Sequence, residues 1–486
     1  MSERIIYRFT RDLRLGDHAG LAAALKLGEI VPVLTIDAQL VSRLRASPRR
    51  ATFFCNAVTA LASALHERGG TLVVRRGPAF RTLRQLALAT GARGVAWMAS
   101  YDGRGIAADR GLQSSLEEAQ LRALIIHDAP AISPEETAEA RPSSGTGYRS
   151  FTPFFDLWNA LPVAPLAAPL QFASVDIASE ALPLPNEFDA KADTAMLASE
   201  AAARERLRRF LDGPALAYSI ARNVPAAGST SSLSAHLSFG TIAARTVVEA
   251  VRTRMASSFL LTEERLSLRT FMRSLAQRDF FLQLAWNQPQ TEDRPLQHKM
   301  RDFSFAREHA ALAAWKEGKT GYPLVDAGMR ELLATGWMHP RIRAVSAAFL
   351  CFDLGVDWRV GRDAWDRELI EDDPALATGN WQWIAGIGAD LAAYPRIYNP
   401  IKQARTYDPN GTYIRRWLPE LENIPSGVLL DPFVRERRAQ TELPLFGVET
   451  YPRPVVDHEI VAREFLKRYQ RHVDATLPVT FDRANH

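Results

Sequence analysis

The sequence predicts an α/β domain built on a doubly wound parallel sheet, followed by an all-α domain. In residues 1–130, short apolar segments alternate with helical patterns, which is typical of strand–helix–strand units with helices on both faces of a parallel sheet. Residues 131–200 are rich in proline, alanine and polar side chains, as expected of a connection between domains. Residues 201–486 are dominated by helical periodicity and hold most of the tryptophans. We therefore expect an α/β domain, a linker and a helical domain with these boundaries.

The strands of the sheet are expected where short apolar runs occur. These runs are residues 5–9, 30–36, 71–74, 94–98 and 123–127. Between them, apolar residues at helical spacing predict helices over 51–67 and 80–90. An aromatic segment at 148–155 is expected to anchor the linker, and an amphipathic helix is expected over 457–471.

The composition excludes several classes of protein. The 486 residues carry 59 Lys and Arg against 55 Asp and Glu, and this mild excess permits a nucleic-acid-binding surface without predicting one. With two cysteines, Cys55 and Cys351, the chain cannot build a disulfide framework, a cysteine zinc site or a four-cysteine iron–sulfur cluster. The sequence contains neither a membrane-spanning apolar run nor a signal peptide. We therefore expect a cytoplasmic monomer.

Several catalytic motifs are incomplete. Residues 10–14, after the first strand, contain no glycine fingerprint, which disfavours a dinucleotide bound in the glycine-turn manner. Residues 318–320 resemble a phosphate loop, but Ala313 occupies the place of its first glycine. Residues 458–459 begin a zinc-protease motif that Ala462 interrupts. Hydrolase and metalloenzyme functions are therefore disfavoured, and no metal site is expected.

Four segments of the helical region remain as candidates for chemistry. Hydroxyl-rich residues 228–234 run into a helix, where side-chain and backbone donors suit an anion; a plain serine-rich helix cap is the alternative. On a helix over 271–286, Ser274, Gln277, Arg278 and Phe281 share one face. Residues 321–343 and 371–400 place arginine pairs against an acidic triplet, which indicates a buried charge network.

These segments resemble the cryptochrome/photolyase family over nearly the whole chain. The blocks at 321–330 and 381–400 are the most specific. The resemblance implies an α/β antenna domain, a long linker and a helical domain that holds a U-shaped FAD. In photolyases, the light-excited reduced flavin donates an electron to a flipped-out pyrimidine dimer. The resemblance therefore implies a flavoprotein that absorbs blue light and transfers an electron.

The resemblance also assigns residues to the flavin site. The matching cofactor-binding positions are Tyr218, Thr230, Ser231, Ser232, Leu233, Ser234, Arg278, Arg341, Asp372, Asp373 and Ala377. Arg343 and Glu371 match a buried ion pair. Counted back from Trp381, Ala377 stands where photolyases usually carry asparagine, and plant cryptochromes aspartate, facing flavin N5; a register shift within 374–379, which would assign a neighbouring residue, is the alternative. An alanine side chain can neither donate nor accept a hydrogen bond there.

A tryptophan chain that reduces excited FAD is the second implied feature. Trp381 and Trp358 match its proximal and middle members, whereas the exit position is Phe305. Because phenylalanine is hard to oxidise, the chain ends at Trp358 or leaves through a neighbouring aromatic such as Trp315. Trp383 matches a wall of the pocket that takes the DNA lesion. For any single aromatic, a packed core residue is the alternative.

The positions that the resemblance assigns to DNA contact are Arg222, Ser274, Gln277 and Gln403. Arg222 and Gln403 match the family pattern, whereas Ser274 and Gln277 depart from it. Dimer-repairing photolyases carry glutamate at Ser274 and tryptophan at Gln277, and losing both contacts costs about 2–6 kcal/mol, or roughly tens- to ten-thousand-fold in affinity. Pro340 replaces an asparagine and Ala344 a methionine, and the histidine pair used against (6-4) photoproducts falls on these same two positions.

We therefore predict a cryptochrome-like flavoprotein in which DNA repair is weak or lost. The alternative is a light-dependent DNA photolyase, a carbon–carbon lyase, with a rebuilt substrate pocket, and a FAD-binding scaffold without photochemistry is a third possibility. DNA, damaged or undamaged, is the candidate partner. The identity of a second, antenna chromophore stays open. The two positions that match the family's folate-binding pair are Arg104 and Gly105 here, so that a deazaflavin, a flavin and an empty site remain as alternatives.

Overall fold

The computed structural model describes residues 3–140, 147–163, 172, 177–193, 195–389, 394–435 and 451–476. The chain divides into two compact units, each described by itself below. The first unit comprises Met1–Arg222, Ala227–Glu292 and Asp366–Leu376. The second unit comprises Asn223–Ala226, Asp293–Trp365 and Ala377–His486.

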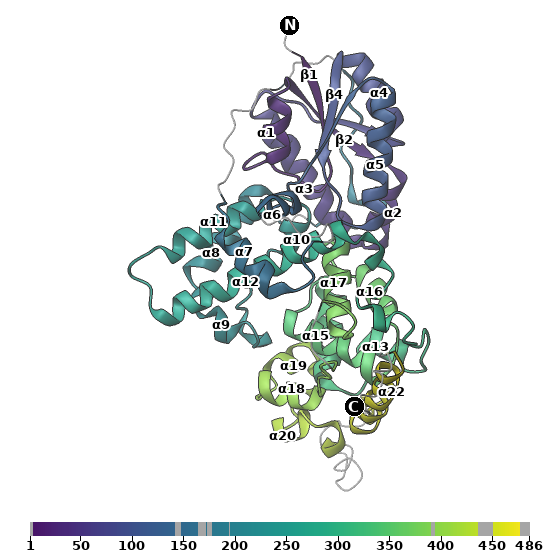
Figure 1. Cartoon of the computed structure of the whole chain (residues 1–486). Helices are drawn as coiled ribbons and strands as arrows, with labels where there is room; N and C mark the ends of the chain where they lie inside the picture. Colours follow the sequence, from purple (N-terminus) through teal and green to yellow (C-terminus); the bar gives the residue numbers. More distant parts are fainter. Residues whose placement is uncertain are drawn as a thin grey trace, which may run out of the picture. The chain divides into compact units, whose positions relative to one another are not determined.

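A five-stranded parallel sheet forms the middle of the α/β part of the first unit (Figure 1). Its strands are β1 (Arg4–Phe9), β2 (Glu29–Ile36), β3 (Val73–Arg76), β4 (Ala92–Met98) and β5 (Arg122–Ile126), in the order β3-β2-β1-β4-β5. The five strands predicted from the apolar runs are confirmed, with boundaries within two residues. The strand order reverses beside β1, so that a switch point lies at the carboxyl ends of β1 and β4, where such sheets bind ligands.

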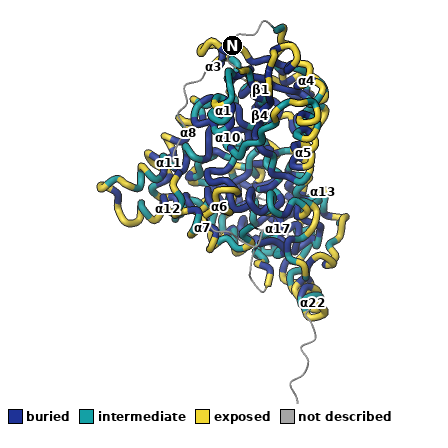
Figure 2. The backbone as a smooth tube through the Cα atoms, turned by 45° about the horizontal axis from the view of Figure 1, so that its top comes forward, coloured by how far each residue is buried: buried dark blue, intermediate teal, exposed yellow. Residues whose placement is uncertain are grey.

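Helices cover both faces of this sheet, which confirms the doubly wound fold. Ile5 and Tyr7 of β1 pack into a core cluster that contains residues of α1 and α3, whereas Ile6 packs into a cluster that contains residues of α4 and α5. Because alternate side chains of a strand point to opposite faces, a continuous apolar strand is buried on both sides. Figure 2 shows the tube largely dark blue, hence buried, around β1 and β4.

The helices of the first unit extend well beyond the α/β part. They are α1 (Ala19–Leu25), α2 (Ala38–Ala46), α3 (Pro48–His66), α4 (Ala79–Thr90), α5 (Gly103–Glu118), α6 (Pro134–Ala140), α7 (Phe151–Ala160), η1 (Pro185–Phe188), α8 (Glu200–Asp212), η2 (Pro214–Ala217), α9 (Tyr218–Ala221), α10 (Ser234–Ser238), α11 (Ala244–Met255), α12 (Thr262–Asn287) and η4 (Pro289–Glu292). The predicted helices over 51–67 and 80–90 correspond to α3 and α4. Helix α3 begins where Ser47 accepts a hydrogen bond from the N–H of Arg50 and Pro48 takes the first helical position.

The second unit is helical. Its elements are η5 (His298–Met300), α13 (Leu312–Glu317), α14 (Pro323–Thr335), α15 (Pro340–Ala348), the π-turn η6 (Phe349–Asp353), α18 (Pro400–Tyr407), α19 (Thr412–Trp417), η7 (Pro419–Leu421), α20 (Ser426–Leu429) and α22 (His458–Thr476). Three further helices contain residues of both units: η3 (Pro225–Ala227), α16 (Trp358–Asp366) and α17 (Pro374–Ile384). The predicted last helix is confirmed as α22 and runs five residues further. Within the described residues, no helix is long and apolar enough to cross a lipid bilayer.

A buried carboxylate ties the α/β part of the first unit to its helical part. Asp128 accepts hydrogen bonds from Arg14 at 2.5 Å, from Arg245 at 2.6 Å and from the N–H of Ala19 at 3.0 Å. Burial raises the pKa of Asp128, but the charges of Arg14, His18 and Arg245 outweigh it and lower the pKa to about 2. The carboxylate is therefore ionised and is the counter-charge of the buried Arg14, whereas Arg245 also pairs with Asp17 at 3.1 Å.

We expect Asp128→Asn to destabilise the protein by about 3 kcal/mol, because the substitution leaves buried guanidinium charge uncompensated. Denaturant unfolding at neutral pH measures this loss. The exposed Asp212, which pairs with Arg208, gives a matched control, and Asp212→Asn is expected to cost less than about 1 kcal/mol. The Asp128 contribution is present above the unfolded-state pKa of about 4 and is lost as the pH falls from about 4 to about 2. Equal stability of the two variants would contradict this role.

Candidate functional site

The hydroxyl-rich segment 228–234 forms a loop in the first unit. Helix α10, which follows it, has only five residues, and its N-cap, Leu233, makes no side-chain capping hydrogen bond. The alternative of a plain serine-rich helix cap is therefore wrong. Ser229 instead donates to the carbonyl of Ala221, and Thr230 and Ser232 lie 3.5 Å apart through their hydroxyl oxygens. Ser232 has a φ of 49°, a conformation that favours glycine.

This loop borders a cavity of about 330 Å³ that combines hydroxyl and guanidinium donors with apolar side chains and with the carboxylate of Glu205, which pairs with Arg209 at 2.6 Å. The residues that line it include Arg206, Arg209, Thr230, Ser231, Ser232 and His236. Burial, together with the charge of Arg206, lowers the pKa of His236 to about 4, so that its imidazole is neutral at pH 7. Hydroxyl groups and guanidinium groups are the donors that phosphate groups prefer in proteins. The residues present therefore fit the pyrophosphate-bearing part of FAD.

Tyr218 joins the predicted flavin positions to the predicted DNA positions. Its buried ring packs against Phe210 and Phe271, with ring centroids 5.9 and 5.3 Å away. Its hydroxyl oxygen lies 3.4 Å from that of Ser274 on α12, and the guanidinium of Arg222 lies 6.0 Å from the ring centroid. The structure thus brings Tyr218, Ser274 and Arg222 together. Gln277 follows on α12 and is half-buried.

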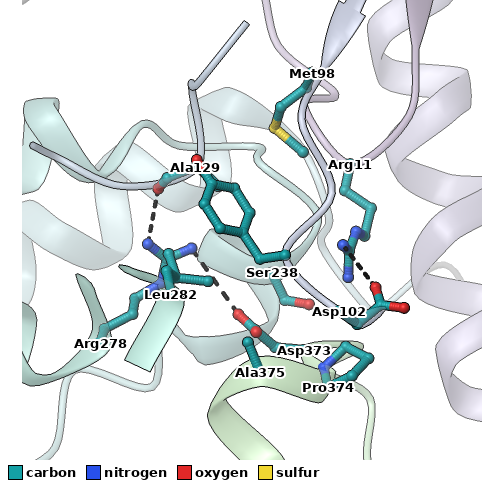
Figure 3. A pocket seen from close by; sticks show the side chains of 11 residues that line it. Arg11, Met98, Asp102, Ala129, Ser238, Arg278, Leu282, Asp373, Pro374 and Ala375 are labelled. Atoms are coloured by element: carbon teal, nitrogen blue, oxygen red, sulfur yellow. Dashed lines mark hydrogen bonds and ion pairs between the residues drawn. The ribbon is translucent and has the colours of Figure 1, made fainter. Parts of the chain in front are cut away.

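Arg278 lies near the switch point of the sheet (Figure 3). It donates to the carbonyl of Ala129 at 2.7 Å, and its Nη2 lies 4.0 Å from Asp373. Burial raises the pKa of Asp373, and the nearby charges of Arg278 and Arg11 oppose the rise. The cavity that these residues share with Arg11 and Asp102 measures about 10 Å³, which is room for one water molecule. Within the first unit, a cavity of this size is too small for a dinucleotide.

Asp372, within the acidic triplet, is the centre of a charge network whose arginines are not the pairs at 321–343 that the sequence predicted. Arg43 forms a short ion pair with its carboxylate, Arg50 lies 4.0 Å away, and Arg11 donates to its carbonyl at 2.7 Å. The N–H of Asp372 donates to the hydroxyl of Ser238 at 2.8 Å. Burial raises the pKa of Asp372, but these arginines lower it to about 2. Sequence reasoning missed Arg43 and Arg50, which lie more than 300 residues away along the chain.

Arg341 is held firmly in the second unit. It donates to Oδ1 of Asn223 at 2.7 Å, and its guanidinium lies 4.6 Å above the centroid of the Tyr407 ring. Asn223 and Tyr407 were not singled out from the sequence, because both are distant from Arg341 along the chain. Pro340 takes the first position of α15, where a missing N–H costs no helical hydrogen bond. The fold therefore tolerates proline at this position, where the family carries asparagine.

The aromatic positions of the second unit differ in their surroundings. Trp358 and Trp381 are buried, whereas Trp383 is half-buried. Phe305 packs against Phe303 and Phe465, with ring centroids 4.9 and 6.1 Å away.

The remaining predicted positions are more exposed to solvent. Ala377, on α17, is half-buried. Gln403, also half-buried, lines a cavity of about 470 Å³ together with the cationic Lys402 and Arg463 and the carboxylate of Glu459. Arg343 donates to the carbonyl of Met338 at 2.8 Å. Because Arg343 and Glu371 belong to different units, their ion pair stays a prediction.

The two positions that match the folate-binding pair lie at the start of α5, where backbone N–H groups donate to carboxylates. Gly105, one of the two residues at that position, donates its N–H to Asp102 at 2.9 Å. The N–H of the neighbouring Gly103 donates to the carboxylate of Glu292 at 2.8 Å. These contacts occupy two backbone donors, the N–H groups of Gly103 and Gly105. The identity of a second chromophore stays open.

Gly361 on α16 makes room for the indole of Trp381. A Cβ at this position would clash with Cη2 of Trp381 and Cδ2 of Leu350. We expect Gly361→Ala to lower stability by about 1–3 kcal/mol, because a well-packed core must shift to admit the methyl group. The tryptophan fluorescence should change at the same time. Gly427→Ala, where a Cβ meets no atom within 4 Å, is the control, and an unchanged stability and spectrum for Gly361→Ala would contradict the close packing.

Two family matches cover most of the chain. Residues 5–170 match the family described as DNA photolyase, and residues 271–471 match the FAD binding domain of DNA photolyase. A deoxyribodipyrimidine photo-lyase of Agrobacterium fabrum is 34% identical over 96% of this chain and 97% of its own length.

Two solved structures are also similar. A cryptochrome of Synechocystis superposes with a TM-score of 0.86 at 29% identity, covering 96% of this chain and 99% of that chain. An archaeal photolyase of Sulfolobus tokodaii with two FAD molecules superposes with a TM-score of 0.80 at 27% identity, covering 96% of this chain and all of that chain. The resemblance in the sequence is thereby confirmed: the chain belongs to the cryptochrome/photolyase family and is a FAD-binding flavoprotein.

Proposed function

We propose that this protein uses blue light to drive electron transfer to its FAD, and that its ability to repair pyrimidine dimers is weak or lost. The proposal rests on the side chains that one face of α12 presents. Ser274 and Gln277 stand where dimer-repairing photolyases carry glutamate and tryptophan. The short Ser274 hydroxyl lies 3.4 Å from the Tyr218 hydroxyl and 3.4 Å from the carbonyl of Thr270. This face therefore offers neither a carboxylate nor a stacking ring to a damaged base.

Each unit supplies side chains that suit part of the cofactor. Thr230, Ser231, Ser232 and Ser234 supply hydroxyl groups for its phosphates. FAD, when bound, absorbs blue light and accepts an electron. Arg341 places a fixed positive charge that favours added negative charge nearby, and Asn223 and Tyr407 hold it in position.

Two further residues govern the chemistry at the flavin. The buried indole of Trp381 is the electron donor from the chain, and its burial keeps water from the site of charge separation. Ala377 presents a methyl group where relatives offer an amide or a carboxyl, so this side chain neither donates a proton nor accepts a hydrogen bond.

A light-dependent photolyase with a rebuilt pocket is the second candidate. The retained Trp383, Arg222 and Gln403 favour it, as does the name of the Agrobacterium fabrum relative. The cationic Lys402 and Arg463 beside Gln403 support contact with a DNA backbone. DNA is therefore the proposed partner.

Two buried free thiols, Cys55 and Cys351, are compatible with the reducing cytoplasm, where we expect a monomer.

Illumination and DNA binding together separate these candidates. We expect the oxidised, FAD-loaded protein to be photoreduced by blue light in the presence of a thiol. In the dark, its affinity for a duplex with one thymine dimer should equal its affinity for the undamaged duplex within about threefold, because no dimer-specific contact remains. A preference of more than about a hundredfold for the dimer would support the photolyase instead. Absence of photoreduction would contradict the electron-transfer function.

A further inference from the structure

Side chains of the α/β part hold the segment 366–373 of the first unit. This segment ends α16, precedes α17 and carries Asp372 and Asp373. Four of its backbone carbonyl groups, those of residues 366, 369, 371 and 372, accept hydrogen bonds from side chains within residues 11–50. A segment bound in this way cannot move without breaking several hydrogen bonds at once.

Arg50 of α3 binds three of these carbonyl groups. Its side chain is fully buried, and its Nη2 donates to the carbonyls of Asp366 at 2.6 Å, Leu369 at 3.3 Å and Glu371 at 3.3 Å. Ser47, which caps α3, donates its hydroxyl to the carbonyl of Leu369 at 3.1 Å. A planar guanidinium offers several donors in a fixed geometry, which the point charge of a lysine does not. Arg50 therefore fixes the path of the segment.

Asp372 adds a second set of contacts. Arg43 of α2 pairs closely with one of its carboxylate oxygens, and Nη1 of Arg50 lies 4.0 Å from the same oxygen. Burial lowers the pKa of Arg43, but the charge of Asp372 outweighs it and raises the pKa above its usual value, so that the pair is charged. The N–H of Asp372 donates to Ser238, and its carbonyl accepts from Arg11. Partners on α2, α3, α10 and the loop after β1 thus fix this one residue.

Asp373, the next residue, has weaker contacts of its own (Figure 3). Nη2 of Arg278 lies 4.0 Å from its carboxylate, whereas Nη1 of the same guanidinium donates to the carbonyl of Ala129 at 2.7 Å. The N–H of Leu376 donates to Asp373 at 3.4 Å. The place of the Asp373 carboxylate is therefore determined mainly by the backbone that Asp372 and its partners hold.

This support matters because a group that contacts a cofactor must be placed accurately. Binding groups need to lie within roughly 0.5 Å of their productive positions, and a loop reaches this accuracy only when surrounding contacts support it. Asp373 and Arg278 are the residues here that the sequence resemblance assigns to the flavin site. A displacement of the segment would therefore move a carboxylate of that site.

We propose that Arg43 and Arg50 are positioning residues for FAD: together with Asp372 they form a latch that holds Asp373 in place. This inference rests on the assignment of Asp373 to the flavin site, and it is independent of photoreduction and of DNA repair. Through the latch, the α/β part contributes to the affinity for FAD. Because such coupling is reciprocal, bound FAD in turn restrains α2 and α3.

Single variants of the full-length, FAD-loaded protein test the latch. We expect Arg43→Gln to weaken the affinity for FAD at least about tenfold, measured by the fluorescence of released flavin. The visible circular dichroism of the flavin that stays bound should change as well. Arg50→Lys keeps the positive charge but not the planar fork of donors, and it should act in the same direction.

The matched control is Asp17→Asn. Asp17 pairs with Arg245 in the same unit and is as buried as Asp372, so that its loss should lower stability. The affinity for FAD should nevertheless stay within about twofold of the wild type, and the flavin spectrum should not change. Equal losses of affinity for Arg43→Gln and Asp17→Asn would indicate general destabilisation and would overturn the positioning role.

A further variant, Asp373→Asn, separates the latch from the assignment on which it rests. We expect it to weaken the affinity for FAD. If it does so while Arg43→Gln leaves both affinity and spectrum unchanged, the latch is overturned and the assignment of Asp373 stands. If Asp373→Asn changes neither affinity nor spectrum, the assignment fails, and the latch fails with it.

Amide hydrogen exchange gives a second readout without any substitution. Removing FAD from the wild-type protein should speed exchange in residues 366–373 and also in α2 and α3 around Arg43 and Arg50. Helix α4, which packs into the core cluster on the other face of the sheet, is the internal control and should not change. Faster exchange confined to residues 366–373 would show that no restraint passes to α2 and α3, which overturns the latch.

Discussion

Replacing Trp381 with phenylalanine is expected to slow photoreduction of the flavin at least about a hundredfold, equivalent to about 2.7 kcal/mol in the barrier. Phenylalanine keeps most of the buried ring area but is far harder to oxidise than indole. The first electron must then come from a more distant donor. The measurement is the rate of flavin bleaching under constant blue light with excess thiol, compared at equal FAD content.

The control for this prediction is Trp417→Phe. Trp417 lies on α19 of the same unit and has no ring contact with Trp381 among the described residues. Its variant should photoreduce like the wild type. If Trp381→Phe also photoreduces at the wild-type rate, the first electron does not come from Trp381.

Restoring the two family side chains on α12 is expected to restore recognition of damaged DNA. The double variant Ser274→Glu, Gln277→Trp should bind a thymine-dimer duplex roughly tens- to ten-thousand-fold more tightly than the wild type, from contacts worth about 2–6 kcal/mol. Affinity for the undamaged duplex should change little, because phosphate contacts are untouched. Fluorescence anisotropy in the dark, at one fixed salt concentration, measures both affinities.

The matched control is the double variant Ser274→Ala, Gln277→Ala, which removes polar groups from the same face without adding a contact. It should bind the dimer no better than the wild type. An equal gain for both double variants would mean that the added side chains do not touch the lesion. No gain for the glutamate–tryptophan variant would mean that the pocket differs from the family pattern in more than these two positions.

The sheet and the main helices could be predicted because local patterns determine them. A continuous apolar run such as 30–36 is typical of a strand buried on both faces, as in a parallel sheet, and β2 occupies it. The specific block 321–330 proved to be structural. Asp326 within it is buried and accepts hydrogen bonds from Thr320, Gly321 and Tyr451. Sequence specificity at this block reflects a satisfied buried carboxylate.

The partners of the site residues could not be predicted, because they depend on contacts between distant segments. Arg43 and Arg50 meet Asp372 only after the α/β part has folded against residues 366–376 of the first unit. Asn223 similarly reaches Arg341 across more than 100 residues. Trp365 was missed because nothing in its local sequence indicates which ring it packs against. Its contact with Trp381 becomes visible only in the tertiary structure.

The most direct test of the proposed loss of dimer repair is the yield of repaired thymine dimers per absorbed photon. The flavin is first reduced chemically, so that the tryptophan route plays no part, and dimer-containing DNA is then exposed to blue light. The photo-lyase of Agrobacterium fabrum serves as the reference. We predict a yield below about one hundredth of the reference, as the lost dimer contacts require. A yield within about threefold of the reference would contradict the loss of dimer repair and show that this protein is a photolyase.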